Sequence, residues 1–409
     1  MVTLTAPKNI AGKINLPASK SISNRALIIK ALCGDTTPVE NLSECDDTHA
    51  VTKNMASLAS GGKSFDIGAA GTAMRFLTAY LANRKGEWEI TGSTRMKQRP
   101  IKILADALNL LGANIEYTEK EGFPPLHIYG NPLTGGEIEL EGNVSSQYIS
   151  ALLMIAPYMQ KGLTVNLKGK VISKPYILLT LKMMEQFGVN YTWTKNKIRI
   201  EKQQYTPRPY KVESDWSAAS YWYEILAICG EGEIFLTGLT NRSSQGDAKV
   251  AELFSMLGIE TVYSSEGALL RYTGKLAERM IYNFVEQPDL AQTFTVTCCM
   301  LNIPFAFSGL QSLKIKETDR IAALITEMRK TGFVLREDEE GTLIWDGTKV
   351  KAEKEITIKT YDDHRMAMAF APISLKVVNL QIENPEVVSK SYPTFWDDLK
   401  SVGFKITNI

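Results

Sequence analysis

The sequence repeats one local pattern, in which an amphipathic helix is followed by a glycine and then by a strand. The pattern occurs in LADALNLLGANIEY, LKMMEQFGVNYTW, VAELFSMLGIETVY, ITEMRKTGFVLRE and FWDDLKSVGFKIT. Its glycines are Gly112, Gly188, Gly258, Gly332 and Gly403, so neighbouring copies lie 70 to 76 residues apart. A glycine here suits the left-handed residue that ends a helix before the chain turns into a strand.

A second pattern, a short strand that runs into a polar loop and then a helix, occurs twelve times. Ser, Thr, Asp and Pro in these loops are typical of helix starts. The spacing alternates between 26 to 29 residues within a unit and 43 to 47 residues to the next unit, except for a first step of 25. We therefore predict six βαβα units, five with an additional strand pair and the first shorter by about 20 residues.

At 409 residues the chain is too long for one ordinary domain, and six units favour two lobes of three. We expect an N-terminal lobe of residues 18–212 and a C-terminal lobe of residues 213–409 together with residues 1–17. The opening strand precedes the first unit and could pair with either half. The chain would then pass twice between the lobes, which predicts an active site in a cleft there. Alternating strands and helices indicate an α/β or α+β fold.

The composition excludes several classes of protein. Lys and Arg number 46 against 45 Asp and Glu, so the basic excess that binds nucleic acids or membrane surfaces is missing. The N-terminal segment lacks the apolar core of a signal peptide, and no apolar run reaches the length of about 18 residues that a membrane span needs. Five cysteines without a CxxC motif indicate buried thiols in a reducing compartment. We expect a cytoplasmic protein with no nucleic-acid or membrane partner.

Basic residues nevertheless gather in the loops that open helices. Helix N-termini carry unpaired N–H groups and partial positive charge, and they bind anions. This concentration in a near-neutral chain predicts a small ligand with phosphate and carboxylate groups. The residues in these loops are Lys20, Ser21, Arg25, Gly71, Thr72, Arg75, Arg95, Lys97, Arg99, Ser145, Ser146, Gln147, Ser173, Lys174, Lys314, Lys316, Glu317, Asp319, Arg320, Asp363, His364, Arg365 and Lys390.

Each of these residues also has an ordinary structural interpretation. A single Lys or Arg near a helix start is more often a solvated charge, and Ser145, Ser146 and Ser173 are more often simple N-caps. Asp289 follows a proline and has the position of an N-cap, while Glu317 is more often half of a surface ion pair than an acid. The three histidines are too dispersed to predict a zinc site. The joint pattern, and no single residue, favours a functional site.

Seven ordered segments resemble the EPSP synthase (3-phosphoshikimate 1-carboxyvinyltransferase) family. They are LPASKSISNRAL, GAAGTAMRF, RMKQRPI, EGNVSSQYISALLM, VISKPYI, IKETDRI and YDDHRMAMAF, and the likeness runs from about residue 10 to residue 397. The resemblance implies a two-lobed inside-out α/β barrel, in which each lobe has three βαβαββ units and the first unit is shortened.

The same resemblance implies the activity. The enolpyruvyl group of phosphoenolpyruvate would be transferred to the 5-hydroxyl of shikimate 3-phosphate, with release of phosphate by addition and elimination through a tetrahedral intermediate. This reaction belongs to the shikimate pathway of chorismate and aromatic amino-acid biosynthesis. It needs no metal and no organic cofactor, and we expect a monomer that acts on these two small molecules.

The resemblance also assigns roles to residues. Asp289 matches the acceptor of the hydroxyl proton, Glu317 matches the acid at C3 of phosphoenolpyruvate, and Lys20 matches a residue that shares in proton transfer. The matches for binding shikimate 3-phosphate are Ser21, Arg25, Ser145, Ser146, Gln147, Ser173, Tyr176, Asp289, Ser312 and Lys316. The matches for binding phosphoenolpyruvate are Lys20, Gly71, Arg99, Gln147, Arg320, Arg365 and Lys390.

Four positions depart from the family pattern. Ala69 stands in place of Asn, Phe76 in place of Pro, Ser312 in place of Asn, and Trp216 in place of a small residue. The shortened first repeat lacks about one strand pair of the N-terminal lobe. We expect intact chemistry with altered substrate affinity.

Two other functions are weighed against this one. UDP-N-acetylglucosamine enolpyruvyl transferase shares the fold and phosphoenolpyruvate, but it usually has a reactive cysteine in the loop matching residues 91–99, which here reads TGSTRMKQR. A catalytically inactive, anion-binding paralogue should have lost Lys20, Asp289, Glu317 or Arg365, and all four are present.

Overall fold

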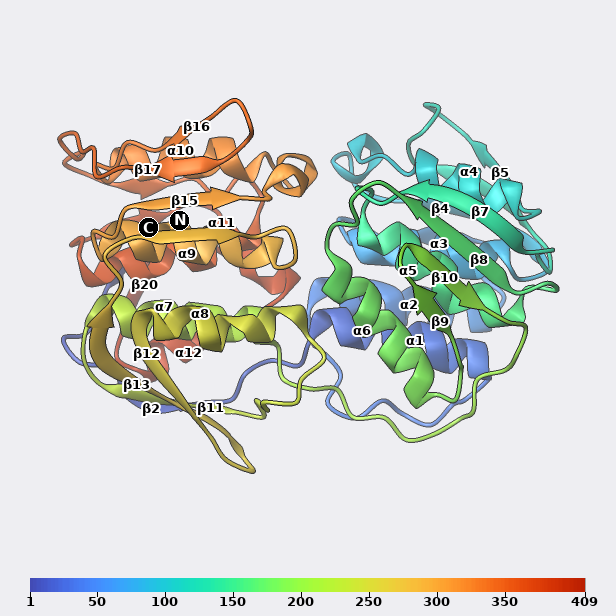
Figure 1. The fold of residues 1–409 in the computed structure, drawn as a ribbon, viewed down its shortest axis with the longest axis horizontal. Coiled ribbons are helices and arrows are strands. Elements are labelled where there is room, and N and C mark those ends of the chain that lie inside the picture. The colour runs from blue at the N-terminus through green and yellow to red at the C-terminus, as the bar shows by residue number, and fades with distance from the viewer. Residues whose placement is uncertain (409) are drawn as a thin grey trace. The chain divides into compact units, whose positions relative to one another are not determined.

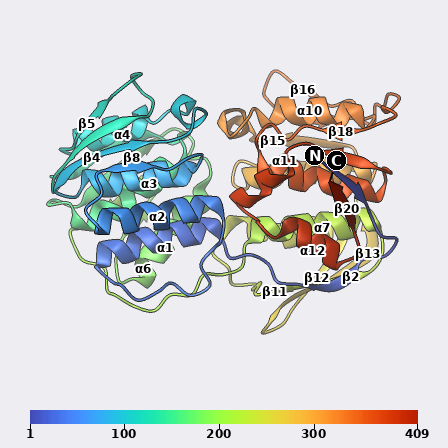
Figure 2. The same cartoon turned by 180° about the vertical axis from the view of Figure 1, so that it is seen from behind.

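The computed structural model describes residues 1–408. The chain forms two compact lobes, one from Ala18–Val212 and the other from Met1–Pro17 together with the chain from Glu213 onward. Strands and helices alternate along the chain in both lobes (Figure 1, and from behind in Figure 2). This alternation confirms the predicted α/β class.

The N-terminal lobe contains two complete βαβαββ units. The first comprises β3 (Ser64–Asp66), α3 (Gly71–Ala82), β4 (Gly86–Thr91), α4 (Lys102–Leu110), β5 (Asn114–Tyr117) and β6 (Leu126–Gly130). The second comprises β7 (Gly136–Glu141), α5 (Ser146–Ile155), β8 (Leu163–Lys168), α6 (Lys174–Gln186), β9 (Thr192–Thr194) and β10 (Lys197–Ile200). Their sheets have the same topology, β3-β4-β6-β5 and β7-β8-β10-β9, with the first two strands parallel and the rest antiparallel.

The first repeat of this lobe consists of two helices, α1 (Lys20–Cys33) and α2 (Asp46–Ala59). Within residues 1–408 no four-stranded sheet belongs to it, which confirms that this repeat is shortened. Its β pairing is an isolated parallel bridge between Glu40 and Lys211. Lys211 lies at the end of this lobe, just before the C-terminal lobe begins at Glu213, and the bridge joins it to the first repeat.

The C-terminal lobe contains three units. The first comprises β2 (Ala11–Ile14), α7 (Trp216–Cys229), β11 (Glu233–Thr237), α8 (Val250–Ser255), β12 (Leu257–Tyr263) and β13 (Gly267–Leu276). The second comprises β14 (Met280–Asn283), α9 (Ala291–Met300), β15 (Phe305–Ser308), α10 (Arg320–Lys330), β16 (Arg336–Glu337) and β17 (Leu343–Trp345). The third comprises β18 (Thr357–Ile358), α11 (His364–Phe370), β19 (Leu380–Ile382), α12 (Phe395–Ser401), β20 (Lys405–Asn408) and β1 (Val2–Thr5).

The two N-terminal strands complete sheets of the C-terminal lobe. Strand β2 pairs in parallel with β11, and β1 lies between β19 and β20 with antiparallel pairing on both sides. The two ends of the chain therefore lie side by side in Figure 1. Short 3-10 helices complete the described chain: η1 (Met96–Gln98), η2 (Ala156–Tyr158), η3 (Gly246–Lys249), η4 (Pro288–Leu290), η5 (Gln311–Ile315), η6 (Ala371–Leu375) and η7 (Pro385–Lys390).

The repeat glycines have the left-handed backbone that their position predicts, with φ angles from 84° to 105°. Gly112, Gly188, Gly332 and Gly403 directly follow the C-caps of α4, α6, α10 and α12. Gly258 instead lies inside β12, at a shift in register against β13, because α8 ends earlier than the pattern predicts. A Cβ is disfavoured at such φ values, so glycine is the natural residue at the four helix ends and at the irregular position in β12.

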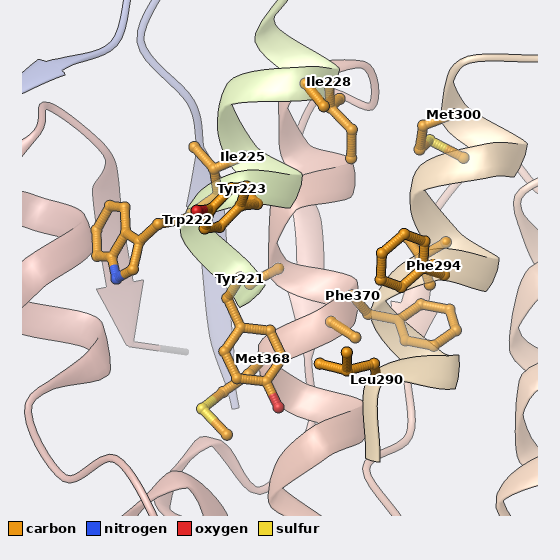
Figure 3. Packing of buried hydrophobic residues seen from close by; sticks show 14 of the residues in the cluster. Tyr221, Trp222, Tyr223, Ile225, Ile228, Leu290, Phe294, Met300, Met368 and Phe370 are labelled. Atoms are coloured by element: carbon orange, nitrogen blue, oxygen red, sulfur yellow. The ribbon is translucent and has the colours of Figure 1, made fainter. Parts of the chain in front are cut away.

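Each lobe has its own hydrophobic core. The C-terminal core surrounds α7, whose aromatic residues are buried on every side of the helix. Figure 3 shows Tyr221 and Ile228 of α7 in the same cluster as Phe294 and Met300 of α9. None of the five cysteines forms a disulfide; Cys45, Cys298 and Cys299 are buried as predicted, whereas Cys33 and Cys229 are only partly buried. In the described part of the chain, no helix is long and apolar enough to cross a bilayer.

Candidate functional site

Most of the residues singled out in the sequence lie at or beside the N-terminal ends of helices, where backbone N–H groups have no partner within the helix. Arg25 lies in the second turn of α1, and Lys390 is the last residue of η7. In the N-terminal lobe they form a set that we call the N-terminal cluster: Lys20, Ser21, Arg25, Gly71, Arg99, Ser145, Ser146, Gln147, Ser173 and Tyr176. In the C-terminal lobe the set, called the C-terminal cluster, consists of Asp289, Ser312, Lys316, Glu317, Arg320, Arg365 and Lys390.

Arg25 of α1 is a buried cation, and no carboxylate within residues 1–408 pairs with it. Its Nε donates to Thr180 Oγ1 at 2.7 Å and its Nη1 to the Ser21 carbonyl at 2.8 Å. Its Nη2 donates to Ser150 Oγ at 3.3 Å and to the Tyr176 carbonyl at 3.4 Å. All four acceptors are neutral, and burial lowers the pKa of Arg25 to about 10. A buried charge without a counter-ion favours an anionic ligand.

Two arginines converge on the start of α3. A Cβ added to Gly71 would lie 2.6 Å from Nη1 of Arg99 and 3.1 Å from Nη1 of Arg75, so a guanidinium lies directly against the glycine. Arg75 also donates to the carbonyl oxygens of Gly71, at 3.0 Å, and Pro100, at 3.1 Å. The absent side chain thus lets cationic groups approach a helix N-terminus, an arrangement that can hold an anion.

Further members of the N-terminal cluster connect helices. Lys20 opens α1, and its Nζ lies 3.9 Å from a carboxylate oxygen of Asp47 on α2. Ser145 is the N-cap of α5 and accepts from the backbone N–H of Gln147 at 3.4 Å, as the N-cap interpretation predicts. Gln147 Nε2 in turn donates to Thr72 Oγ1 at 3.2 Å and so links α5 to α3.

Ser173 departs from the simple N-cap interpretation. It precedes α6 with a left-handed backbone, at φ 51° and ψ 34°, and its side chain makes no capping hydrogen bond. For a residue with a Cβ this conformation is unfavourable by about 1 to 2 kcal/mol. Such backbone strain occurs often at ligand-binding sites, and the Ser173 hydroxyl is not used to cap the helix, so it can bind a ligand.

Arg320 is the centre of the C-terminal cluster and contacts three carboxylates. Its Nε and Nη2 donate to the two oxygens of Asp363 at 2.7 and 3.2 Å. Its Nη2 also donates to Glu317 at 3.0 Å, and its Nη1 donates to Asp289 at 3.1 Å. Because a guanidinium has about five N–H groups, these bonds fix its plane and leave one donor on Nη1.

The remaining cations of the cluster bind the same carboxylates. Arg365 Nη2 donates to Asp289 Oδ2 at 2.9 Å, and Lys316 Nζ lies 3.7 Å from Asp289 Oδ1. Lys390 Nζ lies 2.9 Å from Glu317 Oε1. Burial lowers the pKa of the Lys316 ammonium, while Asp289 opposes the shift. Four cations thus lie close together in this cluster, and an anionic ligand can compete with the carboxylates for them.

Two of the structural interpretations made from the sequence are wrong for residues of the C-terminal lobe. Asp289 is not an N-cap, because it lies inside η4 and its carboxylate binds Arg320 and Arg365. Glu317 is not part of a surface pair, since its side chain is only 13% exposed. Ser312 lies on η5, and in the described chain no hydrogen bond connects it to the other cluster residues.

Several residues that support these clusters had no role in the sequence analysis. Ser150 and Thr180 accept from Arg25, and each is a lone hydroxyl in an apolar stretch, ISALLMI or ILLTLKM. That isolation is a usable signal, because a buried hydroxyl needs a partner. Asp363 was noted in a helix-opening loop without a role, and it is the bidentate partner of Arg320.

Asp247 on η3 is a further missed carboxylate. It is buried and accepts a hydrogen bond from the hydroxyl of Ser217 on α7. Burial and the negative charge of Asp289 raise the pKa of Asp247 to about 6, against the opposing charge of Arg365. The sequence around it, NRSSQGDAK, carries no signal that distinguishes this aspartate from an ordinary helix-start residue.

Comparison with known proteins gives one consistent result. A family model described as EPSP synthase (3-phosphoshikimate 1-carboxyvinyltransferase) matches residues 4–60 and 51–399. The 3-phosphoshikimate 1-carboxyvinyltransferase of Bacteroides fragilis is 56% identical over 405 residues, which cover 98% of each chain. The enzyme of the same name from Vibrio cholerae serotype O1 is 37% identical over 422 residues, covering 97% of this chain and 98% of its own. A solved EPSP synthase from Acinetobacter baumannii has a TM-score of 0.78 over 100% of both chains at 22% identity, which supports the fold.

Proposed function

The chain belongs to the EPSP synthase family and is a transferase of the shikimate pathway, and from this premise we propose how its residues carry the reaction. The 5-hydroxyl of shikimate 3-phosphate adds to C2 of phosphoenolpyruvate while C3 takes up a proton. The tetrahedral intermediate then loses phosphate and returns a proton from C3. This chemistry needs a base for the hydroxyl, an acid near C3, and cations for the phosphates and carboxylates of both substrates.

One observation carries the assignment of acid and base. Arg320 donates to Asp289 at 3.1 Å and to Glu317 at 3.0 Å, so both carboxylates are held on one guanidinium. The two proton transfers occur at the two atoms that flank C2, the attacking hydroxyl oxygen and C3, so the base and the acid must both reach the same reacting pair. Asp289 is the proton acceptor and Glu317 is the proton donor in this proposal, with Lys20 sharing in proton transfer.

The protonation of Glu317 depends on the substrate. Arg320 and Lys390 both contact Glu317, and neighbouring cations favour the ionised form of a carboxyl group. The anionic groups of phosphoenolpyruvate compete for these cations when the substrate binds. The weakened contacts then allow Glu317 to hold the proton that it gives to C3. The same competition makes Asp289 a stronger base, since Arg320 and Arg365 also depress its basicity.

The remaining residues bind the substrates. We assign shikimate 3-phosphate to Ser21, Arg25, Ser145, Ser146, Gln147, Ser173, Tyr176, Asp289, Ser312 and Lys316. We assign phosphoenolpyruvate to Lys20, Gly71, Arg99, Gln147, Arg320, Arg365 and Lys390. The buried, uncompensated charge of Arg25 and the two guanidinium groups at Gly71 support these assignments.

The test measures phosphate release and product formation with phosphoenolpyruvate and one of two acceptors, shikimate 3-phosphate or UDP-N-acetylglucosamine. We expect turnover with shikimate 3-phosphate alone. Asp289→Asn and Glu317→Gln should each lower kcat by about 100-fold or more, because each removes one proton-transfer group. The exposed Asp397, which pairs with Lys400, provides the matched control Asp397→Asn, and this variant should retain full activity.

Other outcomes would reject the proposal. Turnover with the nucleotide sugar would identify the other enolpyruvyl transferase, and no turnover with either acceptor would indicate an inactive paralogue. A pH–rate profile of Glu317→Gln that matches wild type would remove Glu317 from proton transfer. We further propose that the enzyme needs no cofactor, since proton transfer and ion pairing suffice for the chemistry. We also propose that it is monomeric and cytoplasmic. Light scattering of the purified chain tests the monomer.

A further inference from the structure

The side chain of Phe76 faces the guanidinium of Arg25. Phe76 lies on α3 and Arg25 on α1, and the guanidinium carbon of Arg25 is 5.3 Å from the centre of the Phe76 ring. Both side chains are buried, with 0% of Phe76 and 2% of Arg25 exposed. A cation within about 6 Å of a ring centre is attracted by the electron-rich face, and the attraction is strongest where water is excluded.

Arg25 needs such support more than Arg320 does. Its donors reach only neutral oxygens, whereas Arg320 contacts three carboxylates. Burial works against the charged form of Arg25, as its lowered pKa of about 10 indicates. The Phe76 ring offsets part of this desolvation cost without adding a negative charge.

A ring and a carboxylate differ in their effect on an anionic ligand. A carboxylate beside Arg25 would neutralise the guanidinium and repel the ligand. A ring face stabilises the cation and leaves its full charge for the ligand. We propose that Phe76 is a positioning residue for shikimate 3-phosphate, which acts by holding Arg25 charged and in place. This inference rests on the proposed function, in which Arg25 binds that substrate.

The test replaces the ring with an apolar side chain that lacks an electron-rich face. Phe76→Leu should weaken the binding of shikimate 3-phosphate by roughly tenfold, in the dissociation constant from calorimetry and in KM. The kcat and the KM for phosphoenolpyruvate should stay within about twofold of wild type, because the ring does not touch the reacting atoms. If Phe76→Leu does not fold, Phe76→Met fills the same space with a flexible side chain and gives the same test.

Phe187→Leu is the matched control. Phe187 is also 0% exposed in the core of the same lobe, but its ring packs on Tyr210, with centroids 5.4 Å apart. This variant should lose comparable thermal stability and bind shikimate 3-phosphate like wild type. Equal loss of substrate binding in both variants would mean that the core needs bulk and that the ring face is irrelevant, which overturns the proposal.

Arg25→Gln distinguishes a failure of this inference from a failure of the proposed function. In the Arg25→Gln background, the further change Phe76→Leu should leave the affinity for shikimate 3-phosphate unchanged, since the ring acts through the lost cation. A further tenfold loss would overturn the inference. If wild type turns over and Arg25→Gln alone weakens binding while Phe76→Leu does not, the inference fails and the proposed function stands. If wild type neither binds nor turns over this substrate, the proposed function itself fails.

Discussion

The phenolic hydroxyl of Tyr148 donates a 2.5 Å hydrogen bond to the carbonyl oxygen of Pro100, the residue directly after Arg99. Arg75 donates to the same oxygen at 3.1 Å, and its guanidinium carbon lies 5.9 Å from the centre of the Tyr148 ring. Side chains from α5 and α3 therefore hold one backbone oxygen between them. This contact fixes the segment that carries Arg99 towards Gly71.

Removing that hydroxyl should loosen Arg99. We expect Tyr148→Phe to raise the KM for phosphoenolpyruvate by about three- to tenfold, because one buried hydrogen bond contributes about 1 kcal/mol. The KM for shikimate 3-phosphate should change less. Tyr205→Phe is the control, since Tyr205 donates a similar buried bond to Met154 at 2.8 Å in the same lobe. Equal effects of the two variants in steady-state kinetics would contradict a specific role for Tyr148.

A methyl group at Gly71 should displace Arg99 without unfolding the lobe. The added Cβ would lie 2.6 Å from Arg99 Nη1, which is the end of a flexible side chain and can move. We expect Gly71→Ala to raise the KM for phosphoenolpyruvate several-fold and to leave the melting temperature nearly unchanged. Gly12→Ala, where the Cβ would meet a Val402 methyl group at 3.1 Å, is a less crowded control outside the clusters. An unaltered KM in Gly71→Ala would show that Arg99 does not bind this substrate.

Asp363 should be required for the function of Arg320. Asp363→Asn keeps the side-chain oxygen that caps the Arg365 N–H but removes the charge that binds Arg320 at 2.7 Å. Breaking a buried ion pair costs about 3 kcal/mol of stability, and we expect the KM for phosphoenolpyruvate to rise at least tenfold. Asp319→Asn is the control, because Asp319 caps α10 beside Arg320 and Asn caps helices equally well. Steady-state kinetics and urea unfolding measure both variants. An equal KM for phosphoenolpyruvate and an equal stability in the two variants would refute the prediction.

The stability of the C-terminal lobe should depend on pH through Glu224. This residue of α7 is 0% exposed, and burial raises the pKa of its carboxyl well above the ordinary value. Its stabilising contribution is therefore complete below the unfolded-state pKa of about 4.3 and is lost as the pH rises towards the folded-state pKa. Glu224→Gln should gain stability relative to wild type by up to about 1.4 kcal/mol per pH unit in that window. Urea unfolding at pH 4, 6 and 8 measures it, and a constant difference would contradict it.

The helices and their ends could be predicted because short-range chemistry determines them. Gly112, Gly188, Gly332 and Gly403 end helices through a backbone angle that other residues adopt only with strain. Ser145 caps α5 through a bond to a residue two positions away. Such signals lie within a few residues of the feature that they specify, so they depend little on tertiary context, although Gly258 shows that an earlier helix end can displace one.

The partners of the first strands could not be predicted from local signals. Strand β2 has the strand-loop-helix pattern of the first repeat, yet it pairs with β11, more than 200 residues later in the chain. Conversely, Lys211 lies just before the C-terminal lobe in the sequence, yet it pairs with Glu40 of the first repeat. Both pairings join segments that are far apart in the sequence, so they depend on tertiary contacts that no local pattern specifies.

By itself the sequence determined the repeat, the helix starts and the concentration of cations at those starts, because each depends on residue type and spacing. Only the tertiary structure decided how each cation is compensated. Arg25 and Arg320 both lie near helix starts, yet Arg25 meets neutral oxygens and the Phe76 ring while Arg320 meets Asp289, Glu317 and Asp363. The difference arises because buried electrostatics depends on groups brought together from distant segments, and a charge has no fixed energy until those neighbours are in place.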